Sequence, residues 1–173
     1  IHEIREMQVM NMGNYAHGNQ PIQHMLYMYD WGGQSWKTQQ HVREVMGKFY
    51  NSNFDGYCGD EDNGQTSAWY VFSALGFYPV CPASDEYAIG TPLFKKATVS
   101  LPNGKRIVLK APDNSASNFY IDGIKLNGKS WDKVYFKHGD LTDGARITYT
   151  MSSTPNTSRG TAPSDRPYSF SKQ

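Results

Sequence analysis

The sequence predicts an α-helical region followed by a small antiparallel β module. Apolar residues recur at helical spacing up to about Val80, whereas from Tyr87 onward short β-rich runs alternate with Asn-Gly and Asp-Gly turns. Because the helices precede the strands and do not alternate with them, the two sets form successive units and not one interleaved α/β sheet. We place the helical unit at residues 1–86, the β module at residues 87–152 and a flexible tail at residues 153–173.

Four stretches of the first unit have helical character: residues 1–10, residues 22–30, the residues after Ser35, and residues 65–75. Ser35 is a candidate N-cap, and Gly76 suits the position just after the last helix. That last helix is apolar nearly all round, so we expect it to be buried. The first stretch begins without an initiator methionine, from which we expect a fragment of a longer protein.

The β module is predicted from six short runs of β-forming residues. They lie at residues 97–101, 106–109, 119–121, 125–126, 134–136 and 146–151. Asn103-Gly104 between the first two runs is a strong hairpin signal. The tail after these runs is rich in Ser, Thr and Pro, which is why we expect it to be flexible.

Composition excludes several classes of protein. The 173 residues carry a net charge of +1 and 14% aromatic residues, a composition typical of a folded domain and not of a disordered one. Basic residues form no block, so nucleic acid and anionic membranes are not expected partners. No apolar run reaches the roughly 20 residues that span a bilayer. Cys58 and Cys81 are compatible with one disulfide or with two free thiols.

The acidic turn, residues 59–65, is the sharpest chemical feature. Asp60, Glu61 and Asp62 are consecutive and lead through Asn63 into the last predicted helix. Like charges this close need compensation. One interpretation is a helix cap at Asp62 or Asn63. The others are a Ca²⁺ site, because Ca²⁺ prefers oxygen ligands, or a carboxylate that acts as a general base.

A second polar stretch lies at residues 17–24. The side-chain amides of Asn19 and Gln20 suit sugar hydroxyls or a hard cation, and His24 can donate a hydrogen bond. The alternative is a structural histidine and an ordinary N-capping asparagine.

Aromatic residues accompany these polar groups, as in carbohydrate sites, where rings stack on sugar faces. Trp31, in an Asp-Trp-Gly-Gly loop, is the best candidate among them. Lys37 begins a helix, where a positive charge opposes the helix dipole. Either a carboxylate partner or solvation would explain it.

Several runs of this sequence resemble glycoside hydrolase family 92. They are residues 18–21 (Gly-Asn-Gln-Pro), 36–39 (Trp-Lys-Thr-Gln), 55–65, 67–70 (Ser-Ala-Trp-Tyr), 76–80 and 90–94. The similarity extends to about Met151. It implies a calcium-dependent exo-α-mannosidase that inverts the anomeric centre. The implied fold is an (α/α)6 catalytic domain preceded by a β-sandwich, so the helices here would be the C-terminal ones of that barrel.

The resemblance also implies roles for individual residues. Asp60 and Asp62 match the catalytic aspartates that activate water, and Asp62 is our first choice for the base. The expected substrate-binding residues are Asn19, Gln20, His24, Trp31 and Lys37, and the expected Ca²⁺ ligands are Gln20 and Asp62. Many family members have Glu where this chain has Gln20, which reduces the charge available to calcium.

The family's general acid is a glutamate upstream, and no glutamate of this chain matches its motif. We therefore expect this chain alone to be inactive, with the missing N-terminal part of the same enzyme and mannose-containing glycans as its partners. The resemblance implies a secreted, periplasmic or cell-surface protein. The alternative is a non-catalytic module that binds carbohydrate or calcium.

Overall fold

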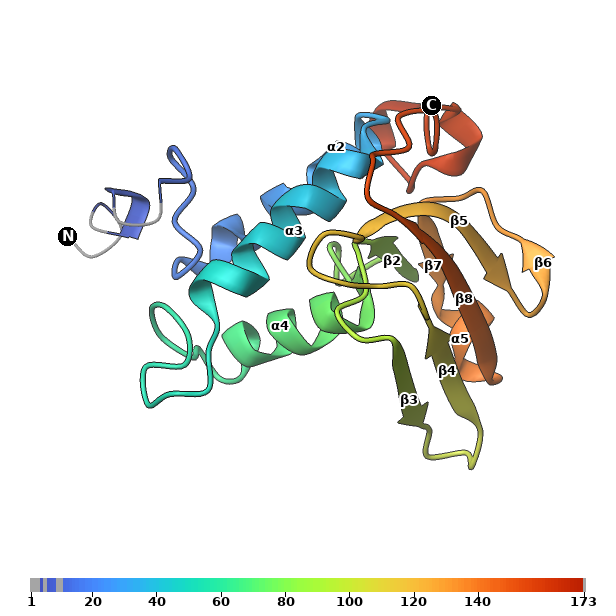
Figure 1. Ribbon diagram of the computed structural model, residues 1–173, viewed down its shortest axis with the longest axis horizontal. Coiled ribbons are helices and arrows are strands. Elements are labelled where there is room, and N and C mark those ends of the chain that lie inside the picture. Colours follow the sequence, from blue (N-terminus) through green and yellow to red (C-terminus); the bar gives the residue numbers. More distant parts are fainter. Residues whose placement is uncertain (1–3, 5, 9–10, 173) are drawn as a thin grey trace.

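The structure, a computed structural model, describes residues 4, 6–8 and 11–172. Helices and strands form two adjacent parts of the molecule, in the order that the sequence predicts (Figure 1). The helical part consists of η1 (Gln20–Tyr27, a 3-10 helix), α2 (Met28–Trp31), α3 (Ser35–Phe49) and α4 (Gln65–Leu75). No helix in the described part of the chain is long and apolar enough to cross a membrane.

The helices largely follow the predicted ones, with two differences. The stretch expected to be one helix at residues 22–30 is η1 followed directly by α2. Ser35 is the first residue of α3 and not its N-cap, which is Gln34, and the Ser35 hydroxyl instead donates to the carbonyl of Arg159 at 3.1 Å. Of the helix expected at residues 1–10, residues 4 and 6–8 are helical, and the others lie outside the described residues.

The core of the helical part lies between η1, α3 and α4. Val42, Val45 and Phe49 of α3 pack in it against Tyr27 and Trp69. These α3 positions recur every three to four residues, so they share one face of the helix. Only part of α4 is buried, although its apolar sequence predicted a buried helix.

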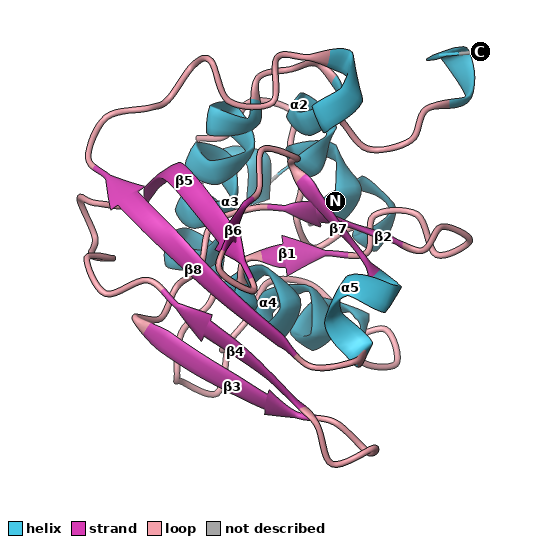
Figure 2. Cartoon of the chain, turned by 90° about the vertical axis from the view of Figure 1, so that its right-hand side faces the viewer, coloured by secondary structure: helices cyan, strands magenta, loops and turns pink. Residues whose placement is uncertain are grey.

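The strands form two sheets (Figure 2). The smaller sheet has the order β1-β2-β7 and the larger sheet the order β3-β4-β8-β5-β6. The bounds are β1 Phe77–Tyr78, β2 Glu86–Ile89, β3 Lys96–Ser100, β4 Arg106–Lys110, β5 Tyr120–Leu126, β6 Lys129–Ser130, β7 Tyr135–Lys137 and β8 Ala145–Ser152.

The larger sheet is mixed, which corrects the prediction of an antiparallel module. β8 pairs with β5 in antiparallel orientation but with β4 in parallel. A parallel pair needs a long connection between its strands, and residues 111–144 provide it. The two runs predicted at residues 119–121 and 125–126 form the single strand β5, with an irregularity between Ile121 and Gly123.

The smaller sheet begins ten residues before the predicted boundary at residue 87, because Phe77 already pairs with Ile89. Phe77, Ile89 and Phe136 share one buried core with Ile107 and Ile147 of the larger sheet. The short helix α5 (His138–Thr142) lies between the runs predicted at residues 134–136 and 146–151. The helical unit and the β module are therefore joined through strands that composition alone did not reveal.

Residues 153–172 are held against the rest of the chain, although their composition predicted a flexible tail. The Arg159 guanidinium donates to the carbonyls of Trp131 at 2.7 Å and Lys133 at 2.9 Å. The indole N–H of Trp31 donates to the carbonyl of Tyr168 at 2.7 Å. Most of these partners are backbone carbonyls, which every residue has, so sequence composition does not indicate such contacts.

Candidate active site

The acidic turn reverses the chain just before α4. Asp62, Asn63 and Gly64 have φ angles of +46°, +56° and +96°, so three consecutive residues adopt the left-handed conformation. Asp and Asn tolerate this region better than most residues with a side chain, and Gly tolerates it best. The run Asp-Asn-Gly therefore gives a tight turn that presents its carboxylates at the beginning of a helix.

Glu61, and not Asp62 or Asn63, provides a side-chain acceptor for the first turn of α4. Its carboxylate accepts hydrogen bonds from the Ser67 backbone N–H at 3.2 Å and from the Ser67 hydroxyl at 2.8 Å. The N-cap residue is Gly64, without a side-chain cap. The carboxylates of Asp60 and Asp62 are exposed and make no hydrogen bond or ion pair with any described residue, which leaves them free for chemistry.

Gln20 joins the second polar stretch to the acidic turn. Its side-chain N–H₂ donates to the backbone carbonyl of Asp60 at 2.6 Å and to the Thr66 hydroxyl at 3.1 Å. The Thr66 hydroxyl donates to the same Asp60 carbonyl at 2.7 Å. Because these bonds use the nitrogen of Gln20, its side-chain oxygen remains available to a ligand or a cation.

The two loops also touch through glycine backbones. A Cβ on Gly59 would lie 2.6 Å from both the Cα and the carbonyl oxygen of Gly18, so no larger residue fits. The backbone N–H of Gly18 donates to the Glu6 carboxylate at 2.8 Å. The sequence contained both glycines, but nothing in it indicated that they meet.

A series of buried hydrogen bonds connects this contact to the core of the helical part. His17 is fully buried and lies between the hydroxyls of Tyr15 and Tyr50, both at 2.7 Å from its ring nitrogens. The Tyr50 hydroxyl donates to the Thr66 carbonyl at 3.1 Å, so it must accept from His17. His17 therefore carries its proton on Nε2, and its Nδ1 accepts from Tyr15. These hydrogen bonds connect the core to Thr66, and the Thr66 hydroxyl connects it to the carbonyl of Asp60.

His17 should make stability depend on pH. Burial lowers the pKa of His17 to about 3, from 6.5 in an unfolded chain. Between these pH values the unfolded state binds a proton at His17 that the folded state does not bind. The contribution of His17 to the free energy of unfolding is therefore fully present above pH 6.5 and is lost as the pH decreases toward 3. The free energy of unfolding can be measured by denaturant titration at several pH values from 7 to 4. Its decrease per pH unit should be steeper in the wild type than in His17→Gln, by up to ~1.4 kcal/mol per pH unit. Equal slopes in the two proteins would contradict this assignment.

Asn19 and His24 lie on the same segment as Gln20. Asn19 is exposed and is the N-cap residue of η1, as the capping alternative expects, but its side chain makes no capping hydrogen bond. The Nδ1–H of His24 donates to the carbonyl of Pro21 at 2.8 Å, which leaves the exposed Nε2 as a free acceptor. Both side chains are accessible, and their roles in substrate binding stay predictions.

The structure does not bring Trp31 and Lys37 to the acidic turn. Trp31 precedes α3 and Lys37 lies in its first turn, whereas the acidic turn follows the loop after the other end of this 15-residue helix, which is about 22 Å long (Figure 1). The Lys37 ammonium lies 5.6 Å from the ring centre of Tyr29 and 5.3 Å from that of Trp36, and it has no carboxylate partner among the described residues. Trp31 instead contacts the C-terminal segment.

Both cysteines are free thiols, which resolves the alternative that the sequence left open. Cys58 borders a hollow with Glu6, Gly59 and Asp60. Burial, assisted by the neighbouring Glu6 carboxylate, raises the pKa of the Cys58 thiol to about 12. Because the thiolate is the reactive form, Cys58 is not suited to act as a nucleophile.

The donor atoms at the turn suit a hard cation only in part. The free oxygens of Asp60, Asp62 and Gln20 are of the kind that Ca²⁺ prefers, but Ca²⁺ takes six to eight oxygens. Within the described residues, no group of three or more His, Cys, Asp or Glu side chains could hold a metal ion. A cation at this turn would need further oxygens from water, from backbone carbonyls or from another part of the protein.

The catalytic-domain model of glycosyl hydrolase family 92 matches residues 2–153. The chain belongs to this family. The match covers the acidic turn, both loops that meet there and the two sheets, so the family extends across the helical and the β part alike.

The chain spans about a fifth to a quarter of the length of the relatives that it matches. An inverting mannosidase of family GH92 from Bacteroides thetaiotaomicron (BT2199) is 60% identical, with a TM-score of 0.88 over 98% of this chain and 23% of its own. The α-mannosidase BT3965 of the same species is 39% identical, with a TM-score of 0.89 over 92% and 22%. A protein of Arthroderma benhamiae named as an uncharacterized secreted glycosidase is 25% identical over 88% of this chain and 20% of its own length.

Proposed function

We propose that this family 92 chain is the C-terminal part of an inverting, calcium-dependent exo-α-mannosidase that removes terminal α-mannosides from mannose-rich glycans. The observation that carries the proposal is the acidic turn. It presents two carboxylates that neither cap the helix nor form ion pairs in the described part of the chain. The mannosidase activity of the two similar structures supports the substrate class.

The turn supplies the base half of an inverting reaction. An inverting glycosidase needs one carboxylate to deprotonate a water molecule and one carboxylic acid, about 6.5–9.5 Å away, to protonate the leaving oxygen. Asp62 would take the water proton, with Asp60 assisting. The bonds from Gln20 and Thr66 hold the Asp60 backbone and so orient the whole turn. The acid would come from the part of the protein upstream of Ile1.

Calcium would be held by Asp62 and the free side-chain oxygen of Gln20, with other oxygens completing its shell. When bound, it would supply a positive charge that orients the sugar hydroxyls. The Gln20 oxygen is neutral, so this site would bind calcium more weakly than one with a glutamate at the same position. Asn19 and the free Nε2 of His24 would add hydrogen bonds to sugar. The name of the Arthroderma relative supports secretion.

The stereochemistry of the product tests the proposed function. The full-length protein should release mannose from a terminal α-mannoside first as the β-anomer, because water attacks the face opposite the leaving group. Proton NMR in the first minutes distinguishes the two anomers. Residues 1–173 alone should show no turnover. Initial release of α-mannose, or turnover by the short chain, would contradict the proposal.

A further inference from the structure

The backbone of the acidic turn is held at three consecutive carbonyls. Those of Glu61 and Asp62 accept from backbone N–H groups at the beginning of α4, both at 3.2 Å. The carbonyl of Asp60 is held in a different way, by the side chains of Gln20 and Thr66. The position of Asp60 therefore depends on the chemistry of two side chains, whereas its two neighbours depend on backbone groups that any residue would supply.

The three polar groups at the Asp60 carbonyl form a closed network. One N–H of the Gln20 amide donates to this carbonyl at 2.6 Å, and the other donates to the Thr66 hydroxyl at 3.1 Å. The Thr66 hydroxyl donates its own hydrogen to the same carbonyl at 2.7 Å. Both hydrogens of the amide nitrogen, the hydroxyl hydrogen and both lone pairs of the carbonyl oxygen are therefore in use.

The orientation of the Gln20 amide follows from its partners. A backbone carbonyl has no hydrogen, so the amide nitrogen of Gln20, and not the amide oxygen, must face Asp60. The Thr66 hydroxyl is fully buried and gives its hydrogen to Asp60, so it can only accept from Gln20. The network consequently requires a donor with two hydrogens at position 20.

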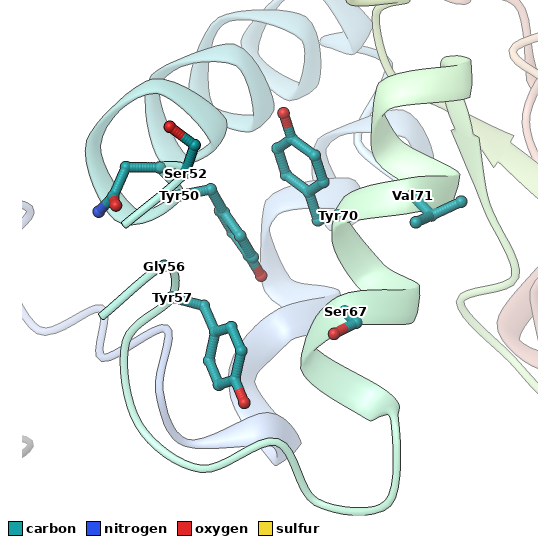
Figure 3. A pocket seen from close by; sticks show the side chains of 8 residues that line it. Tyr50, Ser52, Gly56, Tyr57, Ser67, Tyr70 and Val71 are labelled. Carbon is teal, nitrogen blue, oxygen red and sulfur yellow. The ribbon is translucent and has the colours of Figure 1, made fainter. Parts of the chain in front are cut away.

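Thr66 is itself fixed from the side of α3. The Tyr50 hydroxyl donates to the Thr66 carbonyl at 3.1 Å. Figure 3 shows Tyr50 between the end of α3 and the first turn of α4, which carries Ser67. Because Thr66 is held in this way, Asp60 can move away from the beginning of α4 only if its hydrogen bonds to Gln20 and Thr66 break.

We propose that Gln20 is a positioning residue for Asp60, and that it acts through its amide N–H₂, which a glutamate of the same length cannot replace. An ionised carboxylate has acceptors only, so its oxygen would face the carbonyl oxygen of Asp60 and repel it. It would also leave the Thr66 hydroxyl without a donor. The importance of this residue for the reaction rests on the proposed function, whereas its importance for the order of the turn does not.

A carboxyl group at position 20 would make the order of the turn depend on pH. Its protonated form can donate one O–H to the Asp60 carbonyl and its ionised form cannot, so its pKa would be raised above the usual value of about 4.3. The hydrogen bond would be present at low pH and lost as the pH rises through the raised pKa. The titratable side chains around this position are Glu6, Cys58, Asp60, Glu61, Asp62 and His24. The carboxylates among them act in the same direction, because they repel a further negative charge, whereas a protonated His24 opposes them.

Hydrogen–deuterium exchange of residues 59–67 in the full-length protein tests the proposal. Gln20→Met keeps the length of the side chain but removes the donor. Its backbone amides should exchange roughly tenfold faster than those of the wild type at every pH, the loss expected for two hydrogen bonds. Gln20→Glu should exchange within about threefold of the wild type at pH 4.5 and at least as fast as Gln20→Met at pH 8. Comparison with the wild type at each pH cancels the effects that all proteins share, including the protonation of His17.

Asn19→Asp is the matched control. It places a carboxylate beside the same turn, on an exposed side chain that makes no capping hydrogen bond, and it should exchange like the wild type at both pH values. The proposal is overturned if Gln20→Glu exchanges like the wild type at pH 8, or if its faster exchange is not reduced at pH 4.5. Wild-type exchange in Gln20→Met, or the same pH dependence in Asn19→Asp, would also overturn it.

Turnover distinguishes this role of Gln20 from that of a calcium ligand. The kcat of Gln20→Glu on a terminal α-mannoside, relative to the wild type, should fall roughly tenfold from pH 4.5 to pH 8, in parallel with the faster exchange. A calcium ligand alone predicts the opposite, because an ionised carboxylate binds Ca²⁺ better than an amide does. A rise in relative kcat over this range would therefore overturn the positioning role in the reaction. No turnover by the wild type would reject the proposed function, and the exchange rates would still decide whether Gln20 holds Asp60.

Discussion

Replacing Asp62 with asparagine in the full-length protein should lower kcat on a terminal α-mannoside by roughly 10²–10⁴-fold, the range that a general base contributes. The substitution removes the proton acceptor and little else. Asn has the same shape, and it tolerates the φ of +46° at this position as well as Asp does. The carboxylate makes no bond within the described residues, so the thermal midpoint should stay within about 1–2 °C, as for other surface substitutions. Steady-state kinetics and thermal unfolding of the same preparation measure both quantities.

Glu61→Gln is the matched control for Asp62→Asn. It also removes one negative charge from the same turn, but at the side chain that accepts from Ser67. We expect it to reduce stability by about 0.5–1 kcal/mol, through weaker capping and a weaker interaction with the helix dipole, and to leave kcat within a fewfold of the wild type. Near-normal turnover by Asp62→Asn would remove Asp62 from the base role. An equal loss in both variants would mean that the net charge of the turn, and not a particular base, matters.

The choice between Glu61 and Asp62 shows what sequence could predict about this turn. The run of acids before an apolar helix identified the right segment. The capping interpretation, however, placed the cap at Asp62 or Asn63. The left-handed backbone from Asp62 to Gly64 decides otherwise, because it places Glu61 next to the first turn of α4. Such a backbone conformation is a property of the folded turn, and the spacing of apolar residues in the sequence does not predict it.

Distance along a helix explains the predictions that did not converge on one site. Gln20 and Trp31 are separated by eleven residues, yet η1 and α2 carry them to opposite ends of the helical part. Gln20 meets Asp60 from 40 residues away. Similarly, hydrophobic spacing located α3, α4 and most strands. It did not indicate that β8, which follows β4 after a connection of 34 residues, is the parallel partner of β4. Local patterns contain no information about such pairings.

Replacing Gly59 with alanine should destabilise the 173-residue chain by roughly 2–5 kcal/mol. About 1–2 kcal/mol of this comes from the left-handed φ of +69°, which disfavours any residue with a Cβ. A further 1–3 kcal/mol comes from overpacking, because the new methyl group would lie 2.6 Å from backbone atoms of Gly18. Backbone atoms cannot rotate away as a side chain can, so the two loops must separate. Urea unfolding monitored by tryptophan fluorescence measures the change.

Gly104→Ala separates the two causes. Gly104 has a φ of +79°, but a Cβ there would meet nothing within 4 Å, so this variant should lose only the conformational part, about 1–2 kcal/mol. The difference between the two variants then measures the contact between Gly18 and Gly59. If Gly59→Ala is no less stable than Gly104→Ala, the loops do not meet as described. If Gly59→Ala is the less stable variant, the full-length Gly59→Ala protein should also lose the proposed activity, even though its carboxylates are intact, because separating the loops moves Asp60 away from Gln20 and Thr66.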